Sequence, residues 1–342
     1  MIKVAHLLTS NKYGGAERVA MDIIKGLKKD VSFIYLSPQG TISESLKQAN
    51  IVADTFQLAN IWSLIKSIRS FQPDLIHAHD FKASILANLL FPKISIVTHI
   101  HQAPAWQTKR NLRTLMFLHT ARKNKKILYV SDWARESFLF HSKLRNTQVV
   151  HNGIDFLEIE KLSQQPGAAE YDLLFVGRLE PVKNPLRFVR IARSLSDILP
   201  TIKIGIVGDG SLYEVLAEEC KQIPQVTLLG FRTNPYPLIA NAKVVISTSN
   251  SDAFGLTMIE AAALKTIPFA PNLRGIADIT THIGGQVYLD EQDCVQQLVR
   301  LYTTDVESKR AHHSISKSSL QSFSLDNYLK EIRRVYHAAN TM

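Results

Sequence analysis

The sequence predicts an α/β protein made of two parallel, doubly wound sheets in series. Short apolar runs of strand length alternate with longer amphipathic segments along the whole 342-residue chain, which is the pattern of parallel βαβ units. A polar stretch with Gly and Pro interrupts this alternation at 162–169 (LSQQPGAA), and the pattern then starts again. The length also fits two domains of roughly 100–200 residues each.

The first half opens on an apolar run that predicts a buried strand, and similar runs recur between helical segments. The expected strands are 2–8, 31–36, 75–78, 94–98, 127–130 and 147–150. The expected helices are 16–28, 61–71, 82–90 and 110–122. Together they predict a first Rossmann-like domain at 1–162.

The second half repeats the alternation and predicts a second Rossmann-like domain at 170–324. Its expected strands are 172–176, 202–207, 225–229, 244–247 and 267–270. Its expected helices are 185–196, 212–221 and 257–264, with an amphipathic helix at 325–338 after them. Ligands of such sheets bind outside the carboxyl ends of the strands, so we expect a ligand in a central cleft that both domains face.

Composition limits the function classes. The cysteines, Cys220 and Cys294, provide no disulfide framework and fit a reducing compartment. The apolar run at the N-terminus is too short for a signal peptide, and no segment approaches the ~18 apolar residues of a membrane span. The sequence therefore predicts a cytoplasmic protein.

The net charge of +10 is concentrated in 81–131, which contains no Asp or Glu. The leucines and Met116 of 112–118 alternate there with Arg113 and Arg122 on the expected helix. A basic amphipathic helix suits an anionic membrane surface or an anionic acceptor, whereas the alternative is an ordinary solvated helix face. Nucleic acid is not expected, because no nucleic-acid motif accompanies the charge. The basic residues of this stretch are Lys82, Lys93, Lys109, Arg110, Arg113, Arg122, Lys123, Lys125 and Lys126.

Glycines follow two of the expected strands. Gly14 and Gly15, in YGGAERVA at 13–20, lie between the first strand and a helix. Gly208 and Gly210, in GDGS, lie between a later strand and its helix. Glycine lets the backbone approach a phosphate, and a helix N-terminus carries partial positive charge. Each pair also fits a simple strand-to-helix turn.

Histidines lie at the ends of two strands of the first half, in DLIHAHD at 74–80 and VTHIH at 97–101. His77, His79, His99 and His101 raise the question of a metal site. No carboxylate joins the second group, and we interpret the spacing as alternating between strand faces without convergence. The sequence analysis therefore predicts no metal and no cofactor.

Two cations follow the first strand of the second domain, in VGRLEPVKNP at 176–185. Gly177 places Arg178 just past the strand, and Lys183 lies immediately before the start of the next helix. Arg and Lys hold phosphates by charge-assisted hydrogen bonds. The alternative is an exposed loop with surface cations.

Two acids lie further on, in SDAFGLTMIEAA at 251–262. Asp252 precedes a helix, and Glu260 lies about two turns into it, among apolar neighbours. A carboxylate accepts hydrogen bonds from sugar or ribose hydroxyls, so the two acids can address opposite ends of one ligand. A solvent-facing Glu260 is not expected in such apolar surroundings.

These runs, with HNGID at 151–155, resemble the retaining GT-B glycosyltransferases of family 4, the bacterial group 1 enzymes. The resemblance covers nearly the whole chain. It implies that 325–342 crosses back onto the first domain, and that His101, with His99 as the alternative, contacts the donor sugar. It further implies that Arg178 and Lys183 hold the donor diphosphate.

The resemblance also implies the remaining donor contacts. Asp252 would hold hydroxyls of the sugar, and Glu260 would hold the ribose of the nucleotide. The residues expected near the diphosphate or the nucleotide are Gly14, Gly15, Gly208, Gly210, Phe254, Gly255 and Leu256.

The chain departs from the family pattern around this donor site. Asp252 is one methylene shorter than the usual Glu, and Lys265 replaces a glycine. The following proline is displaced by one residue to Pro268, and a later acid is shortened to Asp278. These changes bear on the identity of the donor, not on the fold.

The sequence thus predicts a metal-independent, retaining glycosyltransferase that uses a nucleotide sugar, most simply a UDP-sugar, by a front-face mechanism. The expected acceptor is a cell-surface glycan or a lipid-linked glycan, with peripheral contact to the inner face of the membrane through 81–131. The alternatives are a catalytically weak subunit that binds a partner glycosyltransferase, and a nucleotide-sugar 2-epimerase.

Overall fold

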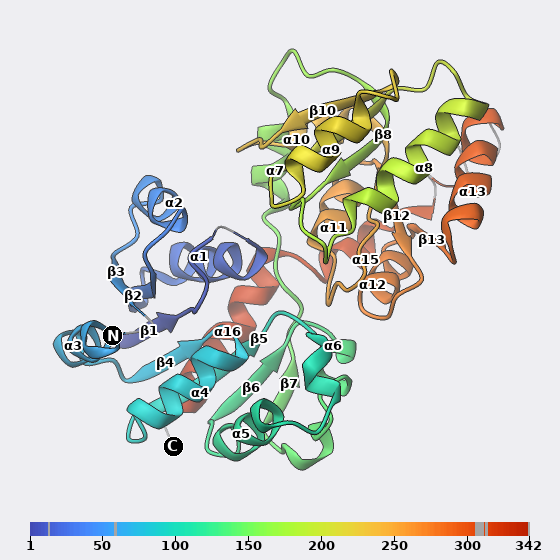
Figure 1. Cartoon of the computed structure of the whole chain (residues 1–342). Coiled ribbons are helices and arrows are strands. Elements are labelled where there is room, and N and C mark those ends of the chain that lie inside the picture. The colour runs from blue at the N-terminus through green and yellow to red at the C-terminus, as the bar shows by residue number, and fades with distance from the viewer. Residues whose placement is uncertain (13, 58–59, 305–310, 312–313, 341–342) are drawn as a thin grey trace. The chain divides into compact units, whose positions relative to one another are not determined.

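The computed structural model describes residues 1–342 except 13, 58–59, 305–310, 312–313 and 341–342. It divides into two units, which are described separately (Figure 1). Unit 1 comprises Met1–Gly153 and Leu325–Met342, and unit 2 comprises Ile154–Ser324. Each unit has a wholly parallel sheet, which confirms the predicted fold class.

Unit 1 has the strand order β3-β2-β1-β4-β5-β6-β7. Its direction of winding reverses between β1 and β4, which is the switch point of a doubly wound sheet. The strands are β1 (Ile2–Leu7), β2 (Val31–Pro38), β3 (Ala53–Phe56), β4 (Leu75–Ala78), β5 (Ser95–Ile100), β6 (Lys126–Tyr129) and β7 (Thr147–Val149).

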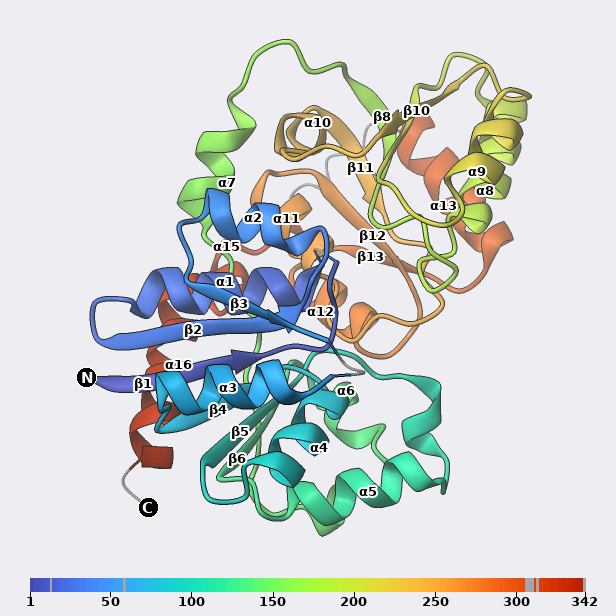
Figure 2. The same cartoon turned by 60° about the vertical axis from the view of Figure 1, so that its left-hand side comes forward.

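Helices cover both faces of this sheet (Figure 2). One face packs on α1 and α16 through a core that includes Val4 and Ile332, and the other packs on α3 and α4 through a core that includes Ile76. The last helix therefore packs with α1, β4 and β5 in unit 1. The helices are α1 (Gly15–Leu27), α2 (Ile42–Gln48), α3 (Trp62–Phe71), α4 (Phe81–Leu90), η1 (Ala105–Thr108), α5 (Leu112–Ala121), α6 (Asp132–Glu136), η2 (His141–Lys143) and α16 (Leu325–Asn340).

Unit 2 has the strand order β10-β9-β8-β11-β12-β13, with its switch point between β8 and β11. The strands are β8 (Tyr171–Val176), β9 (Ile204–Val207), β10 (Val226–Gly230), β11 (Ala242–Ile246), β12 (Ile267–Pro271) and β13 (Gln286–Tyr288). The helices are α7 (Phe156–Ser163), α8 (Pro185–Ile198), α9 (Tyr213–Cys220), α10 (Tyr236–Ala240), α11 (Leu256–Ala263), α12 (Ile276–His282), α13 (Glu291–Thr303) and α15 (Lys317–Gln321).

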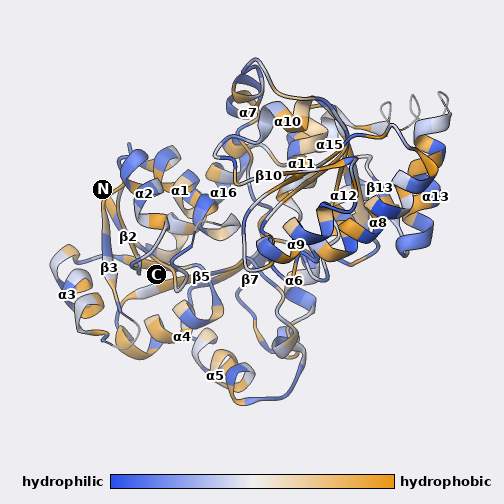
Figure 3. Cartoon of the chain, turned by 45° about the horizontal axis from the view of Figure 1, so that its top comes forward, coloured by the Kyte–Doolittle hydropathy of each residue, from blue (hydrophilic) through white to orange (hydrophobic). Residues whose placement is uncertain are grey.

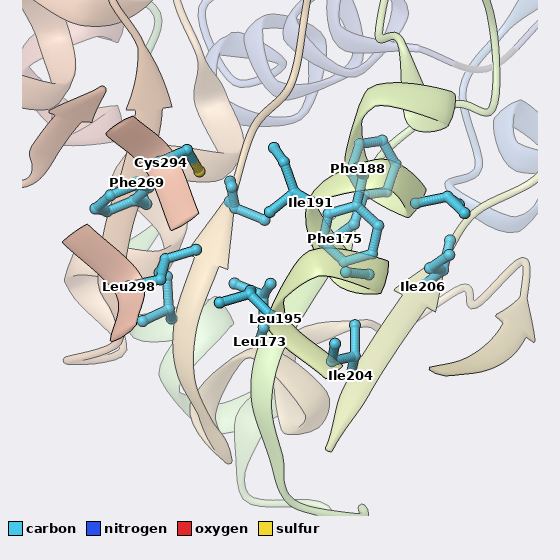
Figure 4. Packing of buried hydrophobic residues seen from close by; sticks show 14 of the residues in the cluster. Leu173, Phe175, Phe188, Ile191, Leu195, Ile204, Ile206, Phe269, Cys294 and Leu298 are labelled. Atoms are coloured by element: carbon cyan, nitrogen blue, oxygen red, sulfur yellow. The ribbon is translucent and has the colours of Figure 1, made fainter. Parts of the chain in front are cut away.

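The main core of unit 2 lies between the sheet and helices α8, α9 and α13 (Figure 4). Phe175 of β8 packs on Phe188 of α8, with ring centroids 5.4 Å apart. Cys294 of α13 is buried in the same core, and Cys220 is also buried. Both thiols therefore serve as small apolar groups in the packing.

The structure differs from the sequence expectation in the boundary between the units and in several elements that were not expected, among them α7, β13 and β3. The units divide at Gly153, before α7, and not in the stretch at 162–169, because α7 packs on α10 and α11 of unit 2. Strand β3 was not expected, because its residues ADTF carry a single large apolar side chain and most of the strand is exposed. It pairs only with β2, at the edge of the sheet.

Candidate functional site

The loops that follow β8 and β11 meet at the switch point of unit 2. Lys183, in the first loop, donates to Asp252, in the second, with 2.5 Å between Nζ and Oδ2. The other oxygen of Asp252 accepts the backbone N–H groups of Phe254 (3.2 Å) and Gly255 (3.0 Å). Residues of two separate motifs, Lys183 and Asp252, thus form a direct ion pair.

The charge on Asp252 is stabilised by these contacts. Burial alone would raise the pKa of its carboxyl, but the Lys183 ammonium and the amides of Phe254 and Gly255 outweigh burial and lower the pKa. The carboxylate is therefore ionised at neutral pH, and the Lys183 ammonium lies directly against it. Two of the backbone amides expected to face a diphosphate are occupied by this side chain.

Hydrogen bonds fasten the two loops to each other. The hydroxyl of Thr248 donates to the carbonyls of Lys183 (3.2 Å) and Asn184 (2.9 Å). The backbone N–H of Asn250 donates to the carbonyl of Val182 at 2.8 Å. Asn184 adopts a left-handed conformation, φ 47°, and caps α8 by accepting from the N–H of Arg187. The backbone around Lys183 is thus fixed from both sides.

Arg178 lies in the same loop with its side chain exposed. Within the described part of the chain its guanidinium forms no hydrogen bond or ion pair, so all five of its N–H donors are available to a ligand. Its backbone is held at both sides, because Gly177 N–H donates to Val207 O at 3.0 Å and Leu179 N–H donates to Asp209 O at 2.9 Å.

The glycines of GDGS have a packing role that the sequence analysis did not separate from phosphate binding. A Cβ at Gly208 would lie 1.9 Å from the carbonyl oxygen of Gly177, and one at Gly210 would lie 2.6 Å from that of Leu179. The two loops therefore pack backbone against backbone at the carboxyl ends of β8 and β9. This contact requires both glycines with or without a ligand.

Glu260 lies inside unit 2, where 5% of its surface is exposed. Its Oε1 accepts a hydrogen bond of 3.2 Å from the hydroxyl of Tyr236 on α10. Leu256, at the start of the same helix, is half-buried. Sequence reasoning missed Tyr236, because an aromatic residue after Pro235 carries no motif; only the folded structure places it against the acid.

Gly255 begins α11 in a left-handed conformation, with φ 80°. A Cβ there would lie 2.7 Å from Cγ1 of Ile276, so both the backbone angle and the packing require glycine. The turn from Asp252 to Gly255 therefore has a fixed shape before any ligand binds.

Lys265, which replaces a glycine of the family pattern, ends α11 in a left-handed conformation with φ 63°. Thr266 N–H donates to Ala261 O, and Lys265 N–H donates to Ala262 O, at 2.9 and 3.0 Å. These bonds form a Schellman ending, in which glycine is normal at this position. Asp278, the shortened later acid, accepts from the N–H of Gly275 at 3.0 Å at the start of α12.

We expect Lys265→Gly to stabilise the protein. The left-handed conformation costs an L-residue about 1–2 kcal/mol, and the greater freedom of glycine in the unfolded chain offsets about 0.5–1 kcal/mol of that gain. The free energy of unfolding by urea should therefore rise by about 0.5–1 kcal/mol. Lys28→Gly is the matched control, because Lys28 follows α1 with φ −58° and should lose stability; equal losses at both positions would contradict the argument.

In unit 1, β1 leads through a loop into α1, whose cap is Gly14 and whose first residue is Gly15. Of the YGGAERVA motif, Tyr13 lies outside the described residues. The residues that follow β1 and β4 are joined at this switch point, where the hydroxyl of Thr9 donates to Oδ2 of Asp80 at 2.7 Å. Asp80 also caps α4 by accepting from the N–H of Ala83. The glycines thus lie beside the switch point of their sheet, at the N-terminus of a 13-residue helix.

The expectation that the histidines of unit 1 do not converge is wrong. Residues two apart on a strand share a face, and β1, β4 and β5 are adjacent. Their rings therefore gather on one face of the sheet, with successive centroids 4.1–5.8 Å apart. The members of this histidine cluster are His6, His77, His79, His99 and His101.

The cluster is buried beneath α16. His77, His79 and His99 are at most 1% exposed, whereas His101 is partly exposed. This difference favours His101 over His99 for a contact with a ligand. Sequence reasoning missed His6 and its partner Tyr336 of α16, although His6 lies near the end of its strand, level with His77.

Burial sets the protonation of the cluster. It lowers the pKa of His6 and of His101 to about 3. Burial, together with repulsion from neighbouring imidazoles, lowers the pKa of His77, His79 and His99 well below the usual value. All five rings are therefore neutral near pH 7, each with one N–H donor and one nitrogen lone pair.

Comparison with known proteins agrees with this geometry. The model of the family "Glycosyltransferase Family 4" matches residues 13–156, and that of "Glycosyl transferases group 1" matches residues 158–319. The Staphylococcus aureus capsular polysaccharide biosynthesis glycosyltransferase CapH is 22% identical over 98% of this chain and 99% of its own.

Two further proteins are similar over most of their length. The Escherichia coli UDP-Gal:alpha-D-GlcNAc-diphosphoundecaprenol alpha-1,3-galactosyltransferase is 21% identical, covering 80% of each chain. The structure of Anabaena Alr3699/HepE in complex with UDP-glucose superimposes with a TM-score of 0.83 at 20% identity, over 98% of this chain and 99% of that one. The fold is thus the GT-B fold.

Proposed function

The chain belongs to the group 1 glycosyltransferases of family 4, and from that premise we propose that it transfers a sugar from UDP to a glycan or lipid-linked acceptor with retention of configuration. The observation that carries the proposal is the ion pair between Lys183 and Asp252 at the switch point of unit 2, in the same loop as the exposed Arg178. The HepE structures hold UDP and UDP-glucose, which supports a uridine donor.

Arg178 and Lys183 would stabilise the charge that develops when the bond between sugar and diphosphate breaks. Negative charge grows on the leaving phosphate, and preorganised cations stabilise that charge more strongly in the transition state than in the bound donor. Arg178 and Lys183 would supply this charge, so the proposed reaction needs no divalent ion at the diphosphate. The leaving phosphate would take the proton of the acceptor hydroxyl on the same face of the sugar, which gives retention.

Asp252 adds a step to donor binding. Its carboxylate holds Lys183 and the start of α11 in the structure, and each carboxylate oxygen has further acceptor capacity. We infer that the donor phosphate attracts Lys183 and that the carboxylate then accepts from sugar hydroxyls. Glu260, beside Tyr236, would accept from the ribose.

Thermal shift measurements test the identity of the donor. We expect UDP and one UDP-sugar to raise the melting temperature, in EDTA as well as without it, and GDP and ADP to have little effect. A ligand at 100 times its dissociation constant stabilises the folded state by about 2.7 kcal/mol. The shifts are compared at the same EDTA concentration, so that any effect of the chelator on the protein itself cancels. No shift with any nucleotide would favour the catalytically weak partner subunit.

Helix α5 supports an acceptor at a membrane surface. Leu112, Leu115 and Met116 are exposed by 73%, 43% and 37% and lie three or four residues apart on one face of the helix. Figure 3 shows both apolar and polar residues on α5. Arg113 and Arg122 are exposed beside them. Such a face suits the boundary between lipid headgroups and acyl chains, and none of the described helices is long and apolar enough to cross a membrane.

Vesicle sedimentation tests this surface. We expect binding to vesicles rich in anionic lipid, weak binding to neutral ones, and at least tenfold weaker binding after Leu112→Ser with Leu115→Ser. Leu157→Ser is the matched control, since Leu157 is an 80% exposed leucine of unit 2. Basic residues near a membrane each contribute about 1 kcal/mol, so neutralising the basic set should weaken binding further. Unchanged binding in both variants would remove the membrane from the proposal. The basic set is Lys109, Arg110, Arg113, Lys123, Lys125 and Lys126.

A further inference from the structure

The histidine cluster of unit 1 holds more imidazoles than the proposed transfer needs. Sugar transfer assigns a contact to His101 alone, whereas five rings lie together under α16. Burying a polar ring nitrogen without a partner costs about 1–3 kcal/mol. A fold that buries several such nitrogens in one place therefore points to a ligand for them.

One part of the cluster forms a hydrogen-bonded chain, in which Nε2 of His77 is without a partner among the described residues. Nδ1 of His6 lies 2.7 Å from Nε2 of His79, and Nε2 of His6 lies 3.3 Å from the hydroxyl of Tyr336. That hydroxyl lies 2.7 Å from Nδ1 of His77. Two sets of protons fit this chain. In one, His79 donates from Nε2 to His6, His6 donates from Nε2 to Tyr336, and Tyr336 donates to His77; in the other, each donor and acceptor is exchanged. The first set leaves the lone pair of His79 on Nδ1, as a metal ligand at that nitrogen requires.

In the other part of the cluster, several ring nitrogens lack partners. Nδ1 of His79 and Nε2 of His101 lie at hydrogen-bond distance, 3.1 Å. Among the described residues, neither ring nitrogen of the fully buried His99 has a hydrogen-bond partner, and Nδ1 of His101 has none either. One nitrogen from each of these three rings lies within 4.8 Å of the others.

We propose that His79, His99 and His101 bind a divalent transition metal ion of the zinc type. Neutral imidazole is a ligand for zinc, copper and nickel. With Zn–N bonds of 2.0–2.1 Å, a tetrahedral site separates its ligand atoms by about 3.4 Å, close to the 3.1 Å between His79 and His101. Three imidazoles leave the fourth position to solvent, which enters past the partly exposed His101. This proposal departs from the sequence expectation of no metal.

This hydrogen-bonded chain would act as the outer shell of the site. A ligating histidine donates its second ring N–H to an acceptor that fixes the tautomer, and His79 would do so toward Nδ1 of His6, whose Nε2 lies against the hydroxyl of Tyr336. Coordination of His101 through Nε2 would keep its proton on Nδ1. The ion would thus join the carboxyl ends of β4 and β5 and orient His101, the histidine that we assign to the donor sugar.

Metal content and cobalt spectroscopy test the site on the full chain, purified without a polyhistidine tag. We expect one equivalent of Zn²⁺ per chain after dialysis. Replacement by Co²⁺ should give the visible bands of a four-coordinate site, and X-ray absorption at the zinc edge should show three imidazoles. These readouts do not depend on activity, so they can fail while the transferase proposal stands, and the reverse also holds.

Variants locate the ion. His99→Leu and His101→Ala should abolish the stoichiometric cobalt bands, and Tyr336→Phe, which keeps the ring, should weaken metal affinity by about 10-fold or more. His119→Ala, which removes an exposed histidine of α5, is the matched control and should leave the bands unchanged. His101 is only partly buried, so its variant is expected to fold even if His99→Leu does not.

Three results would overturn the proposal. They are the absence of a stoichiometric metal, cobalt bands that survive in His101→Ala, and a zinc-edge spectrum without three imidazoles. The zinc-edge spectrum is recorded on the unaltered protein, so it decides the question even if both cluster variants misfold.

Discussion

Arg178→Ala is expected to lower kcat by about 10²–10³-fold, a loss of about 2.7–4 kcal/mol of transition-state stabilisation. The guanidinium is exposed, makes no hydrogen bond or ion pair within the described residues, and lies on a loop whose backbone is fixed by β9 and GDGS. Its removal therefore leaves the fold intact. Since its contact strengthens as the phosphate departs, kcat and kcat/KM should fall together.

The comparison for Arg178 needs matched variants. Arg178→Lys keeps a positive charge but loses the planar fork that binds two phosphate oxygens, so its activity should lie between those of the alanine variant and the unaltered protein. Arg300→Ala removes an exposed arginine of α13 and should have no effect. If Arg178→Ala kept most of its turnover, or raised KM alone, Arg178 would not stabilise the leaving group.

The fold and the positions of Arg178 and Lys183 after β8 could be predicted from the sequence because they depend on local pattern. Apolar runs, glycine turns and the placement of Arg178 and Lys183 after a strand are legible without tertiary information. The pairing of Lys183 with Asp252 could be expected only as a shared location. Its detail, in which the carboxylate accepts from the amides of Phe254 and Gly255 just before α11, depends on the turn at Gly255, which the sequence pattern does not describe.

The histidine cluster shows what the sequence analysis missed. The strand-end positions of His77, His79, His99 and His101 are visible in the sequence, but the spacing was assigned to opposite faces. The strand order that places His6 beside His77 arises from sheet topology. The closing partner, Tyr336, comes from a helix at the far end of the chain, and no local pattern predicts that contact.

Replacing either member of the Lys183–Asp252 pair is expected to cost both activity and stability. Lys183→Ala leaves the half-buried carboxylate without its cation, and Asp252→Ala leaves the amides of Phe254 and Gly255 without their acceptor. An unmade hydrogen bond to a buried group costs about 1–3 kcal/mol, so each variant should unfold at lower urea concentration. Each should also lose about 10²-fold or more in kcat/KM, because the phosphate and the sugar lose a contact.

The pH dependence of stability gives an independent check on Asp252. Its pKa is lowered in the folded state, so the stability that its charge contributes is complete above the unfolded pKa of about 3.9. It is lost as pH falls through the folded value. The difference in unfolding free energy between the unaltered protein and Asp252→Ala should therefore be constant from neutral pH down to about pH 5 and shrink below about pH 4.

A double-mutant cycle separates the ion pair from the donor contacts. If Lys183 and Asp252 act as a pair, the stability losses of the single variants should not add, and the double variant should be about as stable as either one. Asp252→Glu distinguishes the two roles of the acid. Its longer side chain can still reach Lys183 but fits the amides of Phe254 and Gly255 less well, so activity should survive better than stability. Strict additivity in unfolding would show that the acid does not hold the cation. Full activity of Asp252→Ala would show that the acid does not hold the sugar.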